Sequence, residues 1–256
     1  MNKYLPPLIF IALFLFLWQL LPSFGVVNKQ VIPPLLDVIN SFPELFSYNN
    51  TYIPGGFNHH LYLTLFEVAV SYIISIAVAL PLGFILGYYT ILRDSFEPLI
   101  YILYSIPSPL LYPAIYLIFG LGYPSKIALG ILLGLFPLLI NVIAGFRNLE
   151  QIYFSVALSY GANEKQIFTK IILPGIMPSL MSGLRLSLSG VFIGVIVGQI
   201  LASSDGGLGW VISFTAENFA VTQMFAAILI TMLLVYLLLQ TFEIIERKIF
   251  YRYLRR

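Results

Sequence analysis

The chain has 256 residues, of which 59% are hydrophobic and 9% are charged, with a formal net charge of +2. Soluble domains carry about 25% charged residues, so the composition excludes an ordinary soluble protein and indicates that lipid is the main solvent. The small net charge gives no reason to expect nucleic acid, and the absence of cysteine excludes disulfides, zinc–thiolate sites and thiol nucleophiles.

Six apolar stretches are long enough to cross a bilayer as helices, which takes about 20 residues. They are Leu5–Leu21, Leu61–Leu92, Leu99–Leu121, Ile127–Phe146, Ile176–Ala202 and Met224–Ile245. At about 1.5 Å per residue the second stretch is roughly 48 Å long, so it tilts or extends beyond the membrane. The sequence therefore predicts an all-α integral membrane protein with about six transmembrane helices.

The first stretch has a second interpretation as a signal peptide, because the small residues Ser23 and Gly25 follow the apolar run. Its basic flank is weak, however, and its apolar part is longer than a usual signal core. Both features favour a helix that stays in the protein.

Basic residues are distributed unevenly over the connections. With a cytoplasmic N-terminus, ten of them fall on the cytoplasmic side, namely Lys3, Arg93, Arg147, Lys165, Lys170, Arg247, Lys248, Arg252, Arg255 and Arg256. Lys29 and Lys126 fall outside, and Arg185 lies within a span. Because Lys and Arg stay preferentially in the cytoplasm, both termini are predicted to be cytoplasmic.

Glycines recur every four residues in three spans, at Gly83/Gly87, Gly130/Gly134 and Gly190/Gly194/Gly198. Small residues at this spacing let helix backbones approach closely, where lipid supplies no hydrophobic drive for association. The glycines either pack helices of one subunit together or form the seam of a dimer. The first interpretation is favoured.

Prolines interrupt the third and fourth stretches, at Pro107, Pro109, Pro113 and Pro137. Such breaks are tolerated where neighbouring helices or a water-filled cavity satisfy the freed carbonyl groups. They are consistent with a pathway through the membrane.

Few polar side chains lie within the spans. Arg185 either attracts an anion or serves as a snorkelling or packing residue, and the second interpretation is favoured. Glu67, near the outer end of the second span, either marks a functional site or simply reaches interfacial water, and again the second is favoured. Asn141 and Gln199 are the other candidates, with Arg185, for a translocation path.

The polar segment Arg147–Pro174 separates two long apolar stretches and is predicted to form a helical hairpin. One apolar face of its first helix carries Ile152, Tyr153, Val156, Ala157 and Tyr160. Gly161 ends that helix in the left-handed conformation, Asn163 and Gln166 form a capping box for the second helix, and Pro174 stops it. A cytoplasmic hairpin of this kind offers a surface to a soluble partner.

Motifs for catalysis are missing from the sequence. It has no GxxxxGK[ST] phosphate loop, no HExxH and no GxSxG. His59 and His60 are adjacent, so they point in different directions on a helix, and an interfacial role is favoured over metal binding. No enzyme activity, metal or cofactor is therefore expected.

The spacing from Gly161 over nine residues to Ile171-x-Leu173-Pro174 resembles the signature cytoplasmic loop of permease subunits in binding-protein-dependent ABC importers. Further blocks resemble the branch of this family that serves sulfonates, taurine and nitrate: Val31–Phe42, Phe119–Gly130, Phe136–Leu149, Ser182–Gly190 and Leu201–Ile212. The resemblance covers nearly the whole chain and implies the type I importer permease (MetI-like) fold.

The resemblance also implies that the polar segment docks on an ABC ATPase subunit. The residues that it assigns to docking are Ser155, Val156, Ala157, Tyr160, Gly161, Ala162, Ile171, Leu173 and Pro174. Ser155 stands where the family motif opens with a glutamate, so a docking salt bridge at this position is in doubt. Glu150 and Glu164 lie nearby but do not occupy the equivalent helical position.

The implied assembly has two ATPase subunits, a second permease copy and an extracytoplasmic solute-binding protein in a bacterial or archaeal plasma (inner) membrane. Residues 1–60 would form an N-terminal helix and outer segment, residues 61–246 the permease core, and residues 247–256 a basic cytoplasmic tail. The alternatives are a membrane enzyme or an ion-coupled secondary transporter, which normally needs ion-coordinating or proton-relaying residues in mid-membrane.

Overall fold

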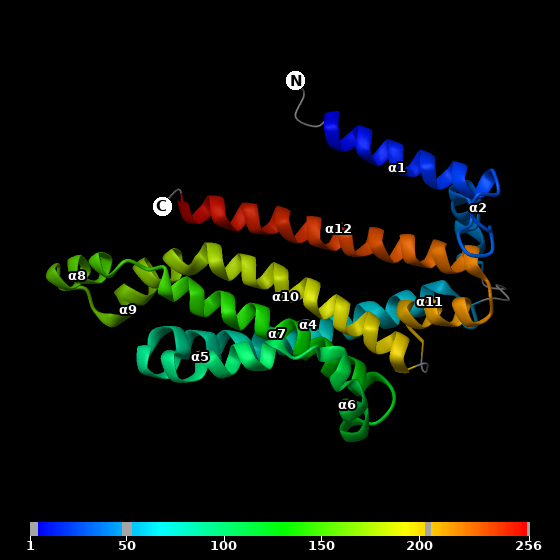
Figure 1. Cartoon of the computed structure of the whole chain (residues 1–256). Helices are drawn as coiled ribbons and strands as arrows, with labels where there is room; N and C mark the ends of the chain where they lie inside the picture. Colours follow the sequence, from blue (N-terminus) through cyan, green and yellow to red (C-terminus); the bar gives the residue numbers. More distant parts are fainter. Residues whose placement is uncertain (1–4, 48–52, 203–205, 255–256) are drawn as a thin grey trace. The chain divides into compact units, whose positions relative to one another are not determined.

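The computed structural model describes residues 5–47, 53–202 and 206–254, which form helices and connections without a strand (Figure 1). The α-helices are α1 (Leu5–Ser23), α2 (Leu35–Asn40), α3 (Phe42–Leu45), α4 (Phe57–Tyr88), α5 (Thr90–Ser105), α6 (Tyr112–Phe119), α7 (Tyr123–Arg147), α8 (Gln151–Ser159), α9 (Glu164–Ile167), α10 (Leu173–Ala202), α11 (Leu208–Glu217) and α12 (Val221–Leu254). A 3₁₀ turn, η1 (Ser108–Leu111), precedes α6, and a π-helical turn, η2 (Phe168–Ile172), precedes α10.

The chain forms two compact units. The first comprises Met1–Thr64 and Ser203–Leu234, and the second comprises Leu65–Ala202 and Val235–Arg256. Helices α4 and α12 contribute residues to both units. The polar segment, α7 and α10 lie wholly in the second unit, which therefore holds most of the candidate functional residues.

Five helices of the described chain are long and apolar enough to cross a membrane. They are Pro6–Ser23, Phe57–Tyr88, Tyr123–Arg147, Glu164–Ala202 and Val221–Lys248. A sixth span is available if the bent pair Thr90–Ser105 and Ser108–Phe119 crosses as one. The predicted all-α membrane architecture is thus confirmed.

The third predicted span, Leu99–Leu121, is wrong as a single helix. The chain bends by 81° between α5 and the η1–α6 segment. Ile106 and Pro107 are both extended there, with ψ angles of 125° and 97°. Because proline disfavours the helical conformation of the residue before it and has no N–H to donate, the helix ends at Ser105.

The prediction that Pro174 stops the second helix of the polar segment is also wrong. The chain is helical from Glu164 through η2 into α10, and Pro174 is the second residue of α10. The hydrogen-bond pattern changes at this point from the π-helical to the α-helical spacing. The missing N–H of Pro174 falls at that change, where its loss is tolerated.

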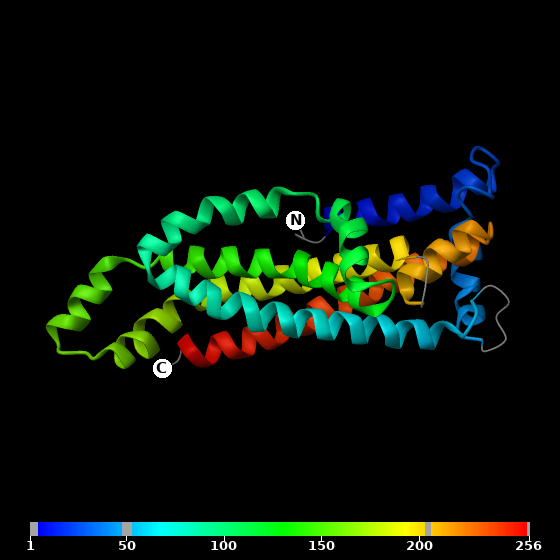
Figure 2. The ribbon, with the colours of Figure 1, turned by 90° about the horizontal axis from the view of Figure 1, so that it is seen from below.

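Glycines bring α7 and α10 into backbone contact along much of their length (Figures 1 and 2). A Cβ atom added to Gly194 would lie 2.7 Å from the carbonyl oxygen of Leu129 and 2.8 Å from the Cα atom of Gly130. A Cβ atom at Gly198 would lie 3.2 Å from the Cα atom of Lys126. These glycines therefore pack two helices of one chain together, which confirms the favoured interpretation.

Helix α4 joins the same bundle through small and polar side chains. A Cβ atom at Gly83 would lie 2.8 Å from the Cβ atom of Val142 on α7. Ser71 and Ser75 donate hydrogen bonds to carbonyl oxygens of α7, those of Ile127 and Ile131, at 3.2 and 3.3 Å. The main buried cluster is formed by apolar residues of α4, α7 and α10, which include Ala79, Leu138, Val142, Ile143, Ile176 and Leu180.

In the first unit, His60 is 4% exposed, so the expected interfacial role is wrong for this residue. Its Nδ1 atom accepts a hydrogen bond of 3.0 Å from the N–H of Gly207, and Nε2 donates one of 2.8 Å to the carbonyl oxygen of Pro54. Thr64, one turn later, accepts from the N–H of Leu208 at 2.8 Å. Since Gly207 has no side chain, His60 and Thr64 cap the first N–H groups of α11.

The contact between α7 and α10 predicts a difference between two Gly→Ala substitutions in α10. Gly194→Ala places a Cβ atom against the backbone of α7, and overpacking of this kind costs about 1–3 kcal/mol. Gly175→Ala meets only the end of the flexible Leu149 side chain, so it should be neutral or stabilising. Thermal unfolding of the solubilised protein measures both, and equal effects would contradict the packing described.

Candidate functional site

The polar segment connects the adjoining ends of α7 and α10. Helix α8 ends at Ser159, and Gly161 then adopts a φ of +72°, as predicted. The Asn163 side chain accepts a hydrogen bond from the N–H of Gln166, and the Gln166 side chain accepts one from the N–H of Asn163, both at 2.9 Å. The predicted capping box is therefore confirmed, and it fixes the start of the helix that leads into α10.

Helix α8 presents apolar side chains to its surroundings. Ile152, Tyr153, Val156, Leu158 and Tyr160 are all exposed, and Tyr160 reaches 88%. Phe154, on another side of α8, packs against the main buried cluster and anchors the helix. Figure 2 shows α8 and α9 at one end of the α7–α10 pair. A helix that is anchored on one side and apolar on the exposed side is suited to contact another protein.

The residues assigned to docking fall into two structural groups. Ser155, Val156 and Tyr160 are exposed, while Ala157 and Ala162 are half-buried beside the exposed turn at Gly161. Ile171, Leu173 and Pro174 are half-buried on η2 and α10, and Leu173 packs against the main buried cluster. The second group therefore holds the segment in place, while α8 carries the accessible surface.

Charged groups near α8 sit at helix termini. Glu150 precedes α8, and Glu164 is the first residue of α9, so each carboxylate lies where the helix dipole favours negative charge. Ser155 donates a hydrogen bond to the carbonyl oxygen of Gln151 in its own helix, at 3.3 Å. At the end of α7, Arg147 forms an ion pair with Glu97 of α5.

The three candidates for the translocation path do not come together. Asn141 is half-buried on α7 and donates to the carbonyl oxygen of Pro137, at 2.7 Å. Arg185 of α10 forms an ion pair with Glu246 of α12. Gln199 is fully buried and donates to Glu67, at 2.6 Å. Asn141 faces Gly183, whereas the neighbouring Gly198 faces Lys126, so Gln199 lies about 20 Å from Asn141 along α7.

Lys126 and Glu67 differ from their predicted positions. Lys126 was expected in an outer connection, and Glu67 was expected to reach interfacial water. Instead both side chains are 0% exposed, and their Nζ and Oε1 atoms lie 3.7 Å apart. The sequence does not predict this pairing, because the two residues are separated by two helices along the chain and meet only in the folded bundle.

A cavity of about 390 Å³ lies where the third span is broken, between the end of α5, η1, α7 and α10. Hydroxyl-bearing side chains in its wall are those of Tyr104, Ser108 and Ser189, and the apolar part of the wall includes Pro137, Leu186 and Ile193. The sequence analysis did not select these hydroxyl residues. The proline cluster at residues 107–113 was the available signal, since a broken helix leaves space and free carbonyl groups.

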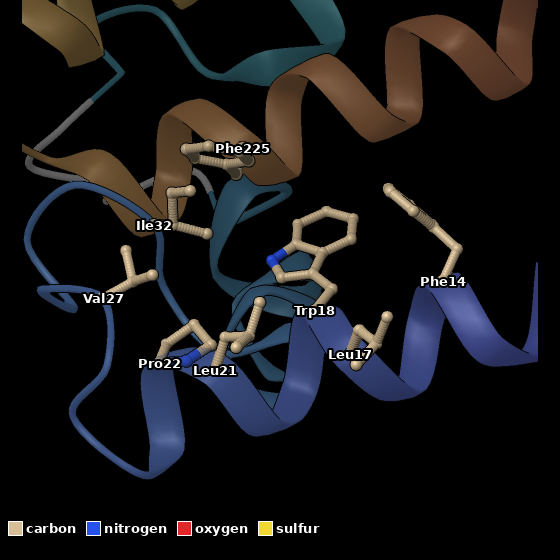
Figure 3. A pocket seen from close by; sticks show the side chains of 8 residues that line it. All are labelled: Phe14, Leu17, Trp18, Leu21, Pro22, Val27, Ile32 and Phe225. Atoms are coloured by element: carbon tan, nitrogen blue, oxygen red, sulfur yellow. The ribbon is translucent and has the colours of Figure 1, made fainter.

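A second hollow, in the first unit, has a different character. Figure 3 shows the side chains that line this hollow of about 390 Å³, among which the Trp18 ring packs against Phe14 and Phe225 with ring centroids 6.2 and 5.9 Å apart. Its lining residues are apolar, and the only side-chain N–H group among them, that of Trp18, donates to the carbonyl oxygen of Pro33 at 3.0 Å. The hollow therefore offers no polar group to bind a charged solute.

The family of binding-protein-dependent transport system inner membrane components matches residues 79–251. The chain belongs to this family. Among relatives in this permease family, a putative ABC transporter permease protein of Methanocaldococcus jannaschii is 28% identical over 79% of this chain and 75% of its own length.

Two relatives have more specific names. The putative aliphatic sulfonates transport permease protein SsuC of Bacillus subtilis is 27% identical over 97% of this chain and 86% of its own length. The taurine transport system permease protein TauC of Escherichia coli is 26% identical over 93% of this chain and 86% of its own length. The predicted membership of the permease family is thus confirmed, as is the location in the inner membrane as a multi-pass protein.

A solved structure confirms the fold. The chain resembles a chain from the inward-facing MetNI methionine ABC transporter with a TM-score of 0.62, over 73% of this chain and 93% of that one. The sequence identity is 22%, so this similarity concerns the fold alone. The MetI-like fold implied by the family resemblance is therefore confirmed.

Proposed function

We propose that this permease is the membrane subunit of an ATP-driven importer for a small oxyanion-bearing solute, such as a sulfonate, taurine or nitrate. An extracytoplasmic binding protein delivers the solute, and α8 docks on a separate ATPase subunit. The exposed apolar face of α8 is the observation that supports docking on the ATPase subunit. The names of the sulfonate and taurine permeases support the class of solute.

ATP hydrolysis belongs to the partner in this proposal. The chain has no GxxxxGK[ST] sequence, so it lacks the loop that cradles ATP phosphates in such subunits. Docking depends on the shape and apolar character of α8 rather than on a salt bridge at Ser155, whose hydroxyl bonds within its own helix. Residues 61–246 form the permease core, flanked by the outer segment of residues 1–60 and the basic tail of residues 247–256.

The solute crosses beside the break in the third span, past the cavity with Tyr104, Ser108 and Ser189 in its wall. Hydroxyl groups donate hydrogen bonds to sulfonate or nitrate oxygens without holding them as tightly as a bare cation would. Leu186 and Ile193, in the same wall, are more than half exposed in the single chain, at 52% and 53%. A second permease copy would complete the enclosure, which favours a homodimer.

The direct test is uptake of radiolabelled taurine, an alkanesulfonate or nitrate into proteoliposomes that contain the permease with its ATPase, supplied with the binding protein outside. Uptake should require ATP inside and should stop when the ATPase is omitted. Uptake that continues without the ATPase would support the ion-coupled alternative and contradict the proposal.

Gly161 provides a specific prediction for coupling. Gly161→Val forces a β-branched residue into the left-handed conformation, which costs about 1–2 kcal/mol. Such a cost shifts the equilibrium between the native turn and other conformations of the segment by about 5- to 30-fold. Uptake per ATP hydrolysed should therefore fall by up to the same factor. Gly161→Asn is the matched control, since asparagine tolerates this conformation and should retain most uptake. Equal uptake by both variants would exclude a role for the turn.

The cavity provides a second prediction. Ser189→Phe fills much of the space and should reduce uptake several-fold while ATP hydrolysis by the assembled transporter persists. The control is Thr241→Phe, which adds the same ring at an exposed position of α12 outside the cavity. Normal uptake by the Ser189→Phe variant would show that the solute does not pass through this cavity.

A further inference from the structure

Three polar side chains with no solvent exposure meet where the start of α7 and the end of α10 pack against α4. Glu67 comes from α4, Lys126 is the fourth residue of α7, and Gln199 lies in the last turn of α10. The Glu67 carboxylate lies 3.7 Å from the Lys126 ammonium group through Oε1 and accepts a hydrogen bond of 2.6 Å from Gln199 through Oε2. The three residues, here called the buried triad, thus link one side chain from each helix.

The backbones around the buried triad are in close contact. Gly198 precedes Gln199, and a Cβ atom there would lie 3.2 Å from the Cα atom of Lys126. Ser71, one turn after Glu67, donates to the carbonyl oxygen of Ile127, the residue after Lys126. The Lys126 ammonium group also lies 5.6 Å from the centre of the Tyr123 ring. The triad is therefore part of a tightly packed region and does not line either of the cavities described above.

The glycines between α7 and α10 fit more than one alignment of the two helices. Gly190, Gly194 and Gly198 repeat every four residues on α10, and Gly130 and Gly134 repeat in the same way on α7. If α10 slid by one turn, about 5.4 Å, so that Gly194 took the place of Gly190 and Gly198 that of Gly194, the close backbone contacts with Leu133 and Leu129 would re-form. The opposite slide would place Leu186 where Gly190 lies, with its Cβ atom about 2.4 Å from the carbonyl oxygen of Leu133. A periodic stripe of glycines sets the distance between two helices but does not by itself select their register.

The buried triad removes this ambiguity. A slide of one turn would separate Gln199 from Glu67 and change the surroundings of two charges that have no access to water. Unpaired buried charges are very unfavourable, whereas the native arrangement places the Glu67 and Lys126 charges beside each other. A single buried polar residue selects the register of coiled coils for the same reason.

We propose that Glu67, Lys126 and Gln199 act as a register lock that selects the native alignment of α7 and α10 and holds α4 to both. The polar segment begins at the other end of α7, 21 residues from Lys126, or about 32 Å along the helix. A motion applied to the segment reaches the far end of the pair only if the two helices do not slide. The lock is thus a positioning device for transport, a consequence that rests on the proposed function.

The register can be measured directly because the chain has no cysteine of its own. A Cβ atom at Gly145 would lie 3.1 Å from the Cβ atom of Ser179, so the pair Gly145→Cys/Ser179→Cys should form a disulfide in the native register. The pairs Gly145→Cys/Gly175→Cys and Gly145→Cys/Gly183→Cys report slides of one turn in either direction. Disulfide yields in isolated membranes then give the ratio of native to shifted alignment.

The decisive variant is apolar throughout: Glu67→Leu, Lys126→Met and Gln199→Leu together. Replacing a buried ion pair and its hydrogen-bond partner by apolar groups of similar size commonly preserves stability, so this variant should fold. The native pair should dominate several-fold in the unmodified background and approach parity with a shifted pair in the apolar variant. Exchanging the charges, Glu67→Lys with Lys126→Glu, should restore the native preference.

The companion variant Lys126→Met alone leaves the Glu67 carboxylate without its cation and should reduce the yield of folded protein strongly. Arg147→Met, which breaks the more exposed pair with Glu97, is the matched control and should change the yield little. An apolar variant that folds and keeps the native disulfide ratio would overturn the register lock. Because this assay needs neither ATPase nor solute, its result is independent of whether the proposed transport activity is found.

Discussion

The close approach of α7 and α10 is the constraint on which the rest of the second unit depends. Gly194 and Gly198 leave room for the facing backbone of α7 and for nothing larger. The polar segment joins these two helices, so its position is set by their contact and by the anchoring of Phe154 in the main buried cluster. An exposed apolar helix is thereby held on a rigid base, which suits a surface that must move together with a docked partner.

Charge placement follows from the same packing. Two basic residues of the long apolar helices face a carboxylate on another helix: Lys126 faces Glu67, and Arg185 faces Glu246. Lys126 is thus buried with its partner, whereas the Arg185 side chain is paired with Glu246 but is 40% exposed. In the proposed function the hydroxyl groups beside the broken third span contact the solute, and the binding protein supplies most of the selectivity.

Local features of the polar segment were predictable from sequence, because short-range geometry determines them. The left-handed turn at Gly161 and the capping box of Asn163 and Gln166 depend only on residues within one turn. The four-residue glycine spacing predicted close packing for a similar reason. Pro174 was misjudged, since local rules stop a helix at proline, while a π-helical turn before it allows the helix to continue.

Long-range pairings could not be predicted from one sequence. Lys126 lies at the edge of an apolar stretch, where a lysine normally reaches water, and only the bundle brings Glu67 and Gln199 to it. The cavity near Ser189 likewise depends on the 81° bend of the third span, which the sequence analysis treated as one apolar stretch interrupted by prolines. Proline positions indicated a break, but the direction of the bend, and hence the wall of the cavity, depends on packing against α7 and α10.

The central claim is that the α7–α10 pair presents α8 to an ATPase subunit, and a single-cysteine cross-link tests it most directly. Val156 is exposed on α8 and can be replaced in a chain that has no other cysteine. In assembled membranes, a short bifunctional reagent at Val156→Cys should capture the nucleotide-hydrolysing subunit, whereas the same reagent at Leu237→Cys on the exposed side of α12 should not. If Val156→Cys never reaches that subunit, or reacts only with reagents added outside the cell, the account is contradicted.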